Sequence, residues 1–591
     1  MKGIIRNAQC GAYDVTWDVN RDNVYNDYTR RVGRDGTTFN VQDIGRTFLV
    51  PNVDRDQSYN INVKVRNTCT GAEKFGTFRL FIYNFRPSND PRQWTDEQIE
   101  IMATMAVQES LWYHHRQMND IAERDTSTIR GRSPYAAATN LAFWQFTTNG
   151  HLPAYPPGRI NRHGINLPNG WEAENDRRWN VDPYAETVIR HINWLTQYYY
   201  RGALGAAEEE NTHGYRWNGN RFVAERINRL ANTSDGHGVR SYGDANTYYM
   251  GMNLGALATA LPALAGTPLQ NGPAGWLWER YIQEITDWLG NMQVDLGCSM
   301  GGWYYNTQTA GDGACHLGDF STTQWAFVGL ESVSVIGEPY DVYVNNRHKY
   351  RVAYQILSNQ QADGGAAYDN RDGGGNRGSD FKMTGGAILA HRMIGTHNMQ
   401  ADNVVPFPDE ATTIPDNLRR RFGYPANAPL TRKMLVDSYN RHLAYQALWF
   451  NQRKVFGSHW LDGNWQHGDY LCGNTNAVYN AGRCGNTYTM YSSQKGYATG
   501  LPTLERVGQW DWRRMYTTYY MRAQDRGMDV NNPLTGYDSF GRVTDDYCET
   551  TSVTCGWGSG HLGAAMGGLV MTPTVFNPPP VPLATVQPNR V

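Results

Sequence analysis

The chain repeats one theme along most of its length, and this repetition constrains the fold more than any other feature. Each copy has an aromatic-rich helical segment that ends near a glutamine, then a Gly-rich polar loop, then a helix of small residues. Such a period has to be recognised first, because a missed repeat misassigns the whole fold. The glutamine-ending segments are residues 192–197, 288–293, 354–360, 447–452 and 520–524, and the small-residue helices are residues 136–149, 247–261, 321–335, 383–394, 488–501 and 560–570.

A long helix expected over residues 95–118 completes six helix pairs. A single pair cannot bury its apolar face, so neighbouring pairs have to stack. Six pairs can close into a ring that hides both ends of the array, and no polar capping repeat is evident that would end an open solenoid. The sequence therefore predicts a mainly α protein in which residues 95–573 form an (α/α)6 toroid of six helical hairpins.

The N-terminal region has a different period. Residues 13–19 and 59–65 alternate between polar and apolar side chains, as half-buried β-strands do, and residues 77–83 follow the same theme. We expect a small β-sandwich over residues 1–88 and a linker over residues 89–94. The string from Thr95 to Gln98 is a capping box that predicts the start of the first long helix. Residues 574–591 are Pro-rich and predict an extended tail.

The cysteines suggest an oxidising compartment. There are eight of them, an even number, and they fall into sequence-local pairs. Persistent disulfides favour an extracellular, cell-surface or periplasmic protein, with free thiols in a cytosolic protein as the alternative. The first residues show no signal peptide, so the numbering begins after processing or export takes another route. We expect the disulfides Cys10–Cys69, Cys298–Cys315, Cys472–Cys484 and Cys548–Cys555.

Charge and hydropathy exclude several classes of partner. The net charge is −2 and no basic run occurs, so we expect no nucleic-acid partner. The longest apolar stretch, near residues 254–265, is shorter than the roughly 20 residues of a membrane span. No Cys/His spacing typical of zinc or c-type haem is present, so we expect neither a metal site nor a cofactor. His114 and His115 are adjacent on a helix and therefore point in different directions, which favours a structural role.

Several strings resemble the terpenoid-cyclase and prenyltransferase-like toroid superfamily, in particular bacterial proteins with prenyltransferase/squalene-oxidase repeats. Residues 319–326 are similar to the D-x-S-x-T-Q-W-A opening of a helix in that superfamily, and Leu569 to Pro573 resemble the close of its final helix. The resemblance covers roughly residues 95–575 and implies an (α/α)6 barrel. The resemblance also rests on the glycine-rich strings of residues 301–304, 363–365 and 462–465.

The chemical motifs of that superfamily are not matched. A D-x-D-D motif holds the acid of class II cyclases, but the nearest string here, Val543 to Asp546, lacks its first aspartate. Zinc prenyltransferases need Asp, Cys and His ligands, and Asp312, Cys315 and His316 do not have the required spacing.

Other toroids cleave polysaccharides with paired carboxylates about 5–10 Å apart or with Tyr and His bases. Each carboxylate in the inter-helix loops is by default a helix cap or turn former, and Asp319, just before a helix, fits an N-cap well. The candidate catalytic residues are Asp319, Asp363, Asp372, Asp380, Asp462, His467, Asp469, Tyr470, Asp546 and Glu549.

Two functions follow from these patterns. Missing catalytic motifs, scarce lysine (8 of 54 basic residues) and expected disulfides favour a non-catalytic exported structural or binding protein, a self-assembling subunit of an extracellular fibre or surface layer. We then expect self-association through the N-terminal β domain or the Pro-rich tail. The alternative is a carbohydrate-active enzyme or glycan-binding module that uses the toroid cavity, ranked above an isoprenoid cyclase.

Overall fold

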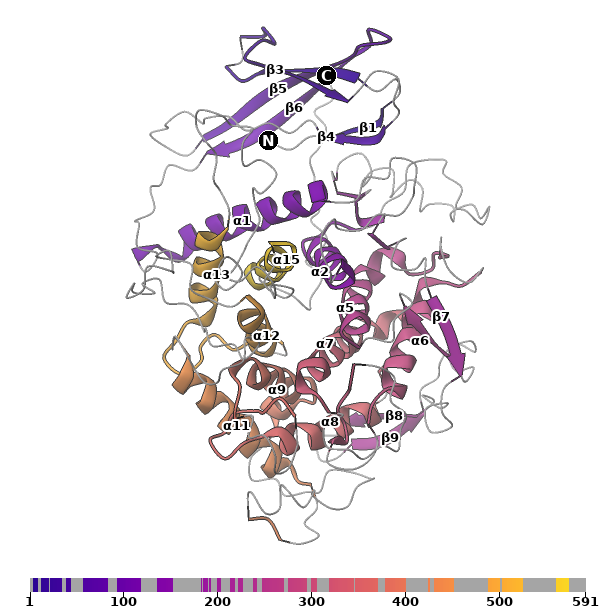
Figure 1. Ribbon diagram of the computed structural model, residues 1–591, viewed down its shortest axis with the longest axis vertical. Helices are drawn as coiled ribbons and strands as arrows, with labels where there is room; N and C mark the ends of the chain where they lie inside the picture. The colour runs from indigo at the N-terminus through magenta and orange to yellow at the C-terminus, as the bar shows by residue number, and fades with distance from the viewer. Residues whose placement is uncertain are drawn as a thin grey trace.

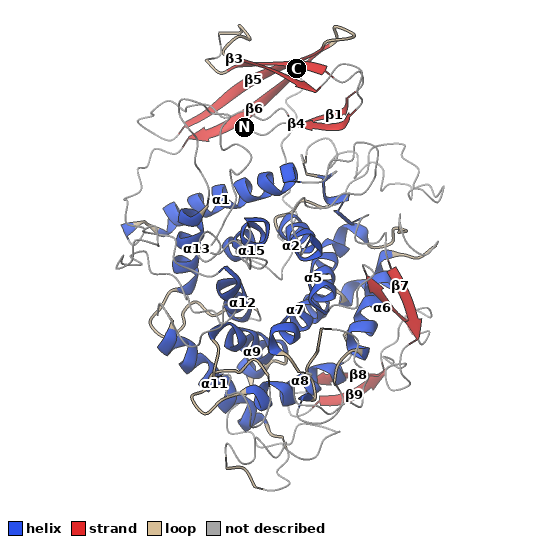
Figure 2. Ribbon diagram, in the orientation of Figure 1, coloured by secondary structure: helices blue, strands red, loops and turns tan. Residues whose placement is uncertain are grey.

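Helices dominate the computed structural model, which confirms the prediction of a mainly α protein (Figure 2). The structure describes residues 4–8, 12–20, 22–33, 39–43, 57–82, 93–117, 135–152, 182–192 in part, 199–203, 213–217, 222–226, 237–241, 247–269, 275–294, 299–305, 318–344, 346–369, 378–399, 423–425, 430–450, 487–499, 502–524 and 560–572.

The N-terminal strands form a four-stranded antiparallel sheet in the order β3-β2-β5-β6 and a two-stranded ribbon of β1 and β4. The central strand β2 buries Tyr13, Val15 and Trp17, while the residues between them are more exposed, which is the alternation expected of one buried sheet face. The strands lie outside the helical part of the molecule (Figure 1). They are β1 Ile4–Ala8, β2 Ala12–Asp18, β3 Tyr28–Gly33, β4 Phe39–Asp43, β5 Gln57–Asn67 and β6 Glu73–Ile82.

The helices fall where the repeat predicts them. The small-residue helices are α2 Tyr135–Thr148, α5 Thr247–Leu264, α7 Phe320–Ile336, α9 Phe381–Met393, α12 Thr487–Ala498 and α15 Gly560–Met571. The aromatic-rich helices are α1 Asp96–Gln117, α6 Trp278–Asn291, α8 Asn346–Asn359, α11 Arg432–Trp449 and α13 Trp512–Ala523. Between α2 and α5 the chain also forms two ribbons that the sequence did not predict: β7 Tyr199–Ala203 with β10 His237–Ser241, and β8 His213–Trp217 with β9 Phe222–Arg226.

The six small-residue helices form a closed inner ring (Figure 1). Each packs on the next in the order α2, α5, α7, α9, α12 and α15, and α15 returns to pack on α2. The aromatic-rich helices surround this ring: α6 packs on α5, α8 and α11 pack on α9, α13 packs on α15, and α1 packs on α15 and α2. Every inner helix therefore has an inner neighbour on both sides, and the array has no open apolar end.

Glycine allows two pairs of inner helices to approach closely. A Cβ atom on Gly251 of α5 would lie 2.1 Å from the carbonyl oxygen of Trp325 on α7. One on Gly329 of α7 would in turn lie 2.7 Å from the carbonyl oxygen of Gly251. The same arrangement recurs between α9 and α12, where a Cβ on Gly496 would lie 2.7 Å from the carbonyl oxygen of Gly385. These contacts explain why the inner helices are rich in small residues.

The recurrent glutamine joins one outer helix to the next. In three repeats its side-chain amide donates to a backbone carbonyl of the following outer helix. The bonds run from Gln293 to His348 on α8 (3.0 Å), from Gln360 to Ser438 on α11 (2.9 Å) and from Gln524 to Ala106 on α1 (2.8 Å). Because α1 is the first and α13 the last outer helix along the chain, the bond of Gln524 joins the two ends of the outer layer.

Two Gly-rich loops dock on the first turn of the following inner helix through a threonine. Thr323 Oγ1 accepts a hydrogen bond from the backbone of Trp303 at 2.8 Å, and Thr384 Oγ1 accepts one from the backbone of Ala366 at 2.9 Å. A glycine in each loop has a φ of 86° or 92°, which side chains with a Cβ rarely adopt. The Gly-Gly-Trp and Asp-Gly-Gly strings that carried the family resemblance thus have a structural explanation.

Caps predicted from the sequence are also present. The backbone N–H of Gln98 donates to Thr95 Oγ1 at 3.2 Å, and the backbone N–H of Thr95 donates to Gln98 Oε1 at 3.0 Å, which is the reciprocal capping box. Asp319 and Asp380 cap α7 and α9, and Asp511, which the sequence did not single out, caps α13.

A buried carboxyl group makes stability depend on pH. Burial raises the pKa of Glu331 on α7 from 4.5 to about 7, and the charges of Lys349 and Arg392 only partly oppose this. The native state therefore holds a proton between these two pH values that the unfolded chain has lost, so stability falls as pH rises through this window. Replacing Glu331 with Gln is expected to reduce this pH-dependent fall in the free energy of unfolding by about 3 kcal/mol.

Urea unfolding of the wild type and of Glu331→Gln at pH 5 and pH 8 measures this difference. The control is Glu505→Gln at an exposed position, where the wild-type pH dependence should persist. An identical pH dependence in wild type and Glu331→Gln would show that Glu331 is ionised in the folded protein at both pH values.

Candidate functional site

The N-terminal ends of α5, α7, α9 and α12 meet at one end of the inner ring, which we call the mouth. Tyr248, in the first turn of α5, lies with its hydroxyl 2.5 Å from Ser321 Oγ of α7. Tyr488, in the first turn of α12, accepts a hydrogen bond from Gln324 Nε2 at 2.9 Å. Helix N-termini present backbone N–H groups and a partial positive charge, which stabilise the carboxylates of Asp319 and Asp380 at this end of the ring.

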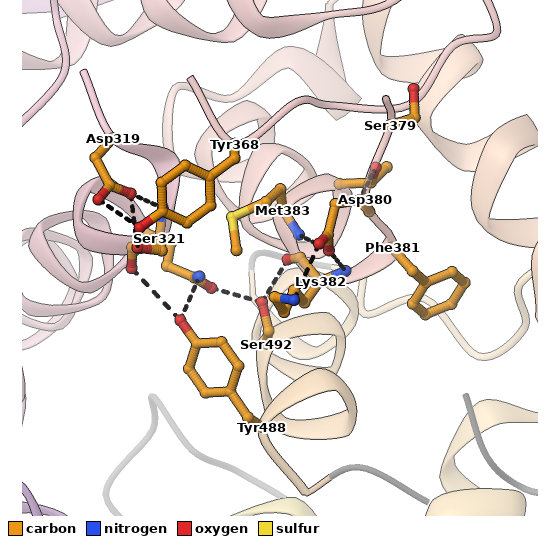
Figure 3. A network of polar contacts seen from close by, with 12 residues as sticks. Asp319, Ser321, Tyr368, Ser379, Asp380, Phe381, Lys382, Met383, Tyr488 and Ser492 are labelled. Atoms are coloured by element: carbon orange, nitrogen blue, oxygen red, sulfur yellow. Dashed lines mark hydrogen bonds and ion pairs between the residues drawn. The ribbon is translucent and has the colours of Figure 1, made fainter. Parts of the chain in front are cut away.

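Asp319, the N-cap residue of α7, is a carboxylate of the mouth, and only 2% of its surface is exposed. Its Oδ1 accepts from the backbone of Ser321 at 2.7 Å, from Ser321 Oγ at 2.6 Å and from the backbone of Thr322 at 3.3 Å. Its Oδ2 accepts from the hydroxyl of Tyr368 at 2.8 Å (Figure 3). Burial raises the pKa of Asp319, while the hydrogen bonds from Ser321 and Tyr368 lower it, and burial dominates.

Two tyrosines connect this carboxylate to the surface of the mouth. Tyr368 and Tyr305 are both half-buried, and their hydroxyl groups lie 3.0 Å apart. Burial and the nearby charge of Asp319 raise the pKa of Tyr368, so its hydroxyl keeps its proton and donates it to Asp319 in a hydrogen bond. The three groups form a continuous polar path from Tyr305 through Tyr368 to Asp319.

A second carboxylate lies at the start of the neighbouring helix α9. Asp380 Oδ1 accepts from the backbone of Lys382 at 2.8 Å and of Met383 at 3.3 Å, and its Oδ2 lies 3.0 Å from Lys382 Nζ (Figure 3). Asp380 and Lys382 are both buried, so they form an ion pair away from solvent. Ser492 of α12 then connects Lys382 to α7, because its Oγ donates to the carbonyl of Lys382 at 2.6 Å and lies 2.5 Å from Gln324 Oε1.

Below the mouth, side chains of two inner helices that are not neighbours in the ring contact each other. Helices α7 and α12 are separated in the ring by α9, yet the rings of Trp325 and Tyr491 lie 5.6 Å apart. Lys495 of α12 places its ammonium group 3.9 Å from the ring centre of Trp325 and 3.4 Å from Gln324 Oε1. Burial lowers the pKa of Lys495 well below its usual range.

Three of the candidate catalytic carboxylates fall in described parts of the chain, namely Asp319, Asp363 and Asp380. Asp363 is exposed and accepts from the backbone of Gly365 at 3.1 Å and from Ser379 Oγ, so it shapes the turn between α8 and α9. The other candidates, Asp372, Asp462, His467, Asp469, Tyr470, Asp546 and Glu549, lie outside the described residues.

Of the cysteines, only Cys69 is described, and it is disulfide-bonded. Cys10, Cys298, Cys315, Cys472, Cys484, Cys548 and Cys555 lie outside the described residues. Within the described chain, no cluster of three or more His, Cys, Asp or Glu side chains could hold a metal ion. No helix in the same parts of the chain is long and apolar enough to cross a membrane.

The tyrosines of the mouth were not among the candidates named from the sequence. A signal for two of them was present, because the string Asn-Thr-Tyr-x-Met occurs at residues 246–250 and again at residues 486–490. It places Tyr248 and Tyr488 in the same position of two inner helices. Tyr305 and Tyr368 lie in loops and carry no comparable repeat.

A concavity of about 480 Å³ lies at the C-terminal end of α12, away from the mouth, between α1 and α13. Two of its three arginines are paired with acidic residues: Arg513 with Glu100 and Arg514 with Asp96, both at 2.8 Å. These ion pairs fasten the last outer helix to the first, which gives the residues around this concavity a structural role.

Comparisons with known proteins give matches only among solved structures. No protein-family profile and no curated protein matches the chain. A family 76 glycoside hydrolase from a bovine Bacteroides thetaiotaomicron strain matches with 7% identity and a TM-score of 0.38, over 96% of this chain and 95% of that one. A GH76 α-mannanase from Bacteroides thetaiotaomicron matches with 9% identity and a TM-score of 0.39, over 82% of this chain and 98% of that one. A family 88 glycosyl hydrolase from Bacteroides vulgatus has 9% identity and a TM-score of 0.24, over 58% and 99%.

These findings correct two of the predictions. The matched structures are glycoside hydrolases, so the prediction of a non-catalytic, self-assembling structural protein is wrong. They agree with a toroid but not with the terpenoid-cyclase resemblance in particular. With TM-scores below 0.5, the likeness itself supports no argument about activity, which has to come from the geometry of the mouth.

Proposed function

We propose that this chain is an enzyme that hydrolyses glycosidic bonds at the mouth of an (α/α)6 toroid. The observation that carries the proposal is the path from the half-buried Tyr305 through Tyr368 to the buried carboxylate of Asp319. A buried base reached through a hydroxyl group is an arrangement that can take a proton from a bound molecule. The complete set of six hairpins belongs to the proposal, because the outer helix expected near residues 192–197 is described only in part.

The proton path defines the roles of the residues. A water molecule gives a proton to the hydroxyl oxygen of Tyr368, which passes its own proton to Asp319 Oδ2 over 2.8 Å. The water oxygen then bonds to the anomeric carbon as the glycosidic C–O bond breaks. The departing oxygen takes a proton from a second acid, a role for which Asp462, His467, Asp469 and Asp546 stay candidates.

The lining of the mouth suits a glycan. A sugar ring has an apolar face and a rim of hydroxyl groups, and tyrosine likewise combines an apolar ring with a polar tip. Tyr305 packs against Tyr248, with ring centres 5.4 Å apart, and against Tyr304 at 5.3 Å. Such rings together with a few fixed polar groups are what a small-molecule site needs for contact area and orientation.

A hydrolase screen on the full chain tests the proposal. Soluble α-mannan, β-mannan, xylan and β-glucan are incubated with the protein, and new reducing ends are measured. Release from at least one of these neutral polysaccharides is expected. Glycan binding with no release would instead favour a glycan-binding module, and neither binding nor release would contradict both carbohydrate-active functions.

Replacing Tyr368 with Phe is expected to lower kcat about 10-fold or more, because the proton path to Asp319 is interrupted. The hydrogen bond from Tyr368 lowers the pKa of Asp319, so its loss raises that pKa further. Since Asp319 accepts the proton in its ionised form, the acidic limb of the pH profile of kcat/KM should move to higher pH. A role of Tyr368 in folding alone, without this hydrogen bond to an active Asp319, would not move this limb.

The matched control for Tyr368 is Tyr439→Phe. Tyr439 also has a bonded hydroxyl group, since it accepts from Arg392 Nη1 at 3.1 Å, but Arg392 belongs to the last turn of α9, away from the mouth. This control should keep the wild-type kcat and pH profile. An equal loss in both variants would indicate a general effect on folding rather than a role for Tyr368 in catalysis.

A further inference from the structure

The outer surface of the N-terminal sheet carries an aromatic pair of which one ring is exposed and the other half-buried. Phe75, on the edge strand β6, is 63% exposed, and its ring lies 5.6 Å from that of Tyr25 at an angle of 66°. Val24, beside Tyr25 in the chain, is 50% exposed. Large apolar side chains that cluster in solvent generally mark a binding surface. We call Val24, Tyr25 and Phe75 the aromatic platform.

The loop that presents half of the platform is held by its own side chains. Asp27 Oδ2 accepts from the backbone of Val19 at 2.5 Å and of Asn20 at 2.9 Å, and Asp22 Oδ1 accepts from the backbone of Val24 at 2.7 Å. The sheet supplies the other half, because Phe75 pairs with Lys64 across β5 and β6. A surface fixed in this way loses little conformational entropy when it binds a ligand.

The charged groups beside the platform are of opposite sign. Lys64 Nζ lies 3.7 Å from Glu73 Oε1 and 5.6 Å from the ring centre of Tyr25. The pair supplies a hydrogen-bond donor and an acceptor next to the rings with little net charge to select an ion. An apolar platform with such a polar border is complementary to the apolar face and hydroxyl rim of a neutral sugar.

We propose that the aromatic platform binds a neutral polysaccharide, so that the N-terminal sheet holds the chain on a glycan surface. This binding site is separate from the mouth and requires no bond cleavage. The choice of a glycan rather than another occupant rests in part on the proposed function. Binding by the sheet would keep a polymer close to the mouth and raise its effective concentration there.

Retention of the full chain on insoluble cellulose, chitin and mannan tests the proposal. Depletion isotherms are measured for wild type, Phe75→Ala and Tyr25→Ala, each in an Asp319→Asn background so that no polysaccharide is consumed. We expect wild type to bind at least one matrix and Phe75→Ala to bind it at least 10-fold more weakly. The matched control is Leu448→Ala, which removes a side chain that is 67% exposed on α11 and should bind within twofold of wild type.

Three outcomes would overturn the proposal. The first is that wild type is not retained on any matrix, and the second is that wild type and Phe75→Ala are retained equally. The third is self-association that Phe75→Ala abolishes, because this would assign the platform to a second copy of the chain. Sedimentation velocity at several concentrations detects the last. A Phe75-dependent retention in a protein that cleaves nothing would contradict the proposed function alone, and cleavage with Phe75-independent retention would contradict this inference alone.

Discussion

Asp319→Asn is expected to lower kcat for glycan hydrolysis by 100-fold or more while the protein stays folded. The amide can still accept the backbone N–H bonds that cap α7, because Asn is as good an N-cap as Asp. The side-chain amide cannot take a proton, however. Its NH2 group replaces Oδ2, the atom that accepts the hydrogen bond from Tyr368 at 2.8 Å in the wild type. Loss of a general base usually costs 10²- to 10⁴-fold in rate.

The matched control is Asp511→Asn at the start of α13. Asp511 caps its helix in the same way, accepting from the backbone of Arg514 at 3.0 Å, but it belongs to the outer layer. It should keep the wild-type rate. Steady-state kinetics on the polysaccharide found in the screen, with circular dichroism of both variants, separate chemistry from folding. An Asp319→Asn enzyme with wild-type kcat would exclude Asp319 as the proton acceptor.

Gly251→Ala is expected to destabilise the folded protein by about 3 kcal/mol or more. The new Cβ would lie 2.1 Å from the carbonyl oxygen and 2.5 Å from the carbonyl carbon of Trp325. Both are backbone atoms of α7, so the helices themselves would have to move apart, and overpacking of this kind costs about 1–3 kcal/mol or more. Helix propensity favours Ala over Gly by about 1 kcal/mol, so a net loss isolates the packing effect.

Gly378→Ala is the control, because a Cβ at that position has no atom within 4 Å and the backbone is not left-handed. Its stability should lie within about 0.5 kcal/mol of wild type. Urea unfolding followed by tryptophan fluorescence measures both variants. A Gly251→Ala protein as stable as wild type would mean that α5 and α7 can separate without cost, and the close packing of the ring would lose its explanation.

The helices and the ring could be predicted because the responsible signals are local. A repeated glutamine, a Gly-rich loop and a run of small residues each act within a few turns of their own position, and each has a defined task in the structure. Gln524 shows this well, since its faint sequence signal corresponds to a hydrogen bond with Ala106 at the other end of the outer layer. The capping box at Thr95 and the cap at Asp319 are likewise decided by residues two or three positions away.

The mouth could not be assembled from the sequence. Asp319 was a candidate, but Tyr248, Tyr305, Tyr368 and Tyr488 come from four segments spread over some 240 residues. Their patterns say which turn of a helix or which loop holds them, not which of those turns and loops lie side by side.

The sequence alone therefore determined the helical character of the main part of the chain and the period of its helices, because these depend on short-range backbone preferences and on the need to bury one face of each helix. The tertiary structure alone decided that Tyr368 donates to Asp319 and that Tyr491 and Lys495 lie against Trp325. The reason is that these contacts join segments far apart in the chain, and only the packing of the ring fixes the distances between them.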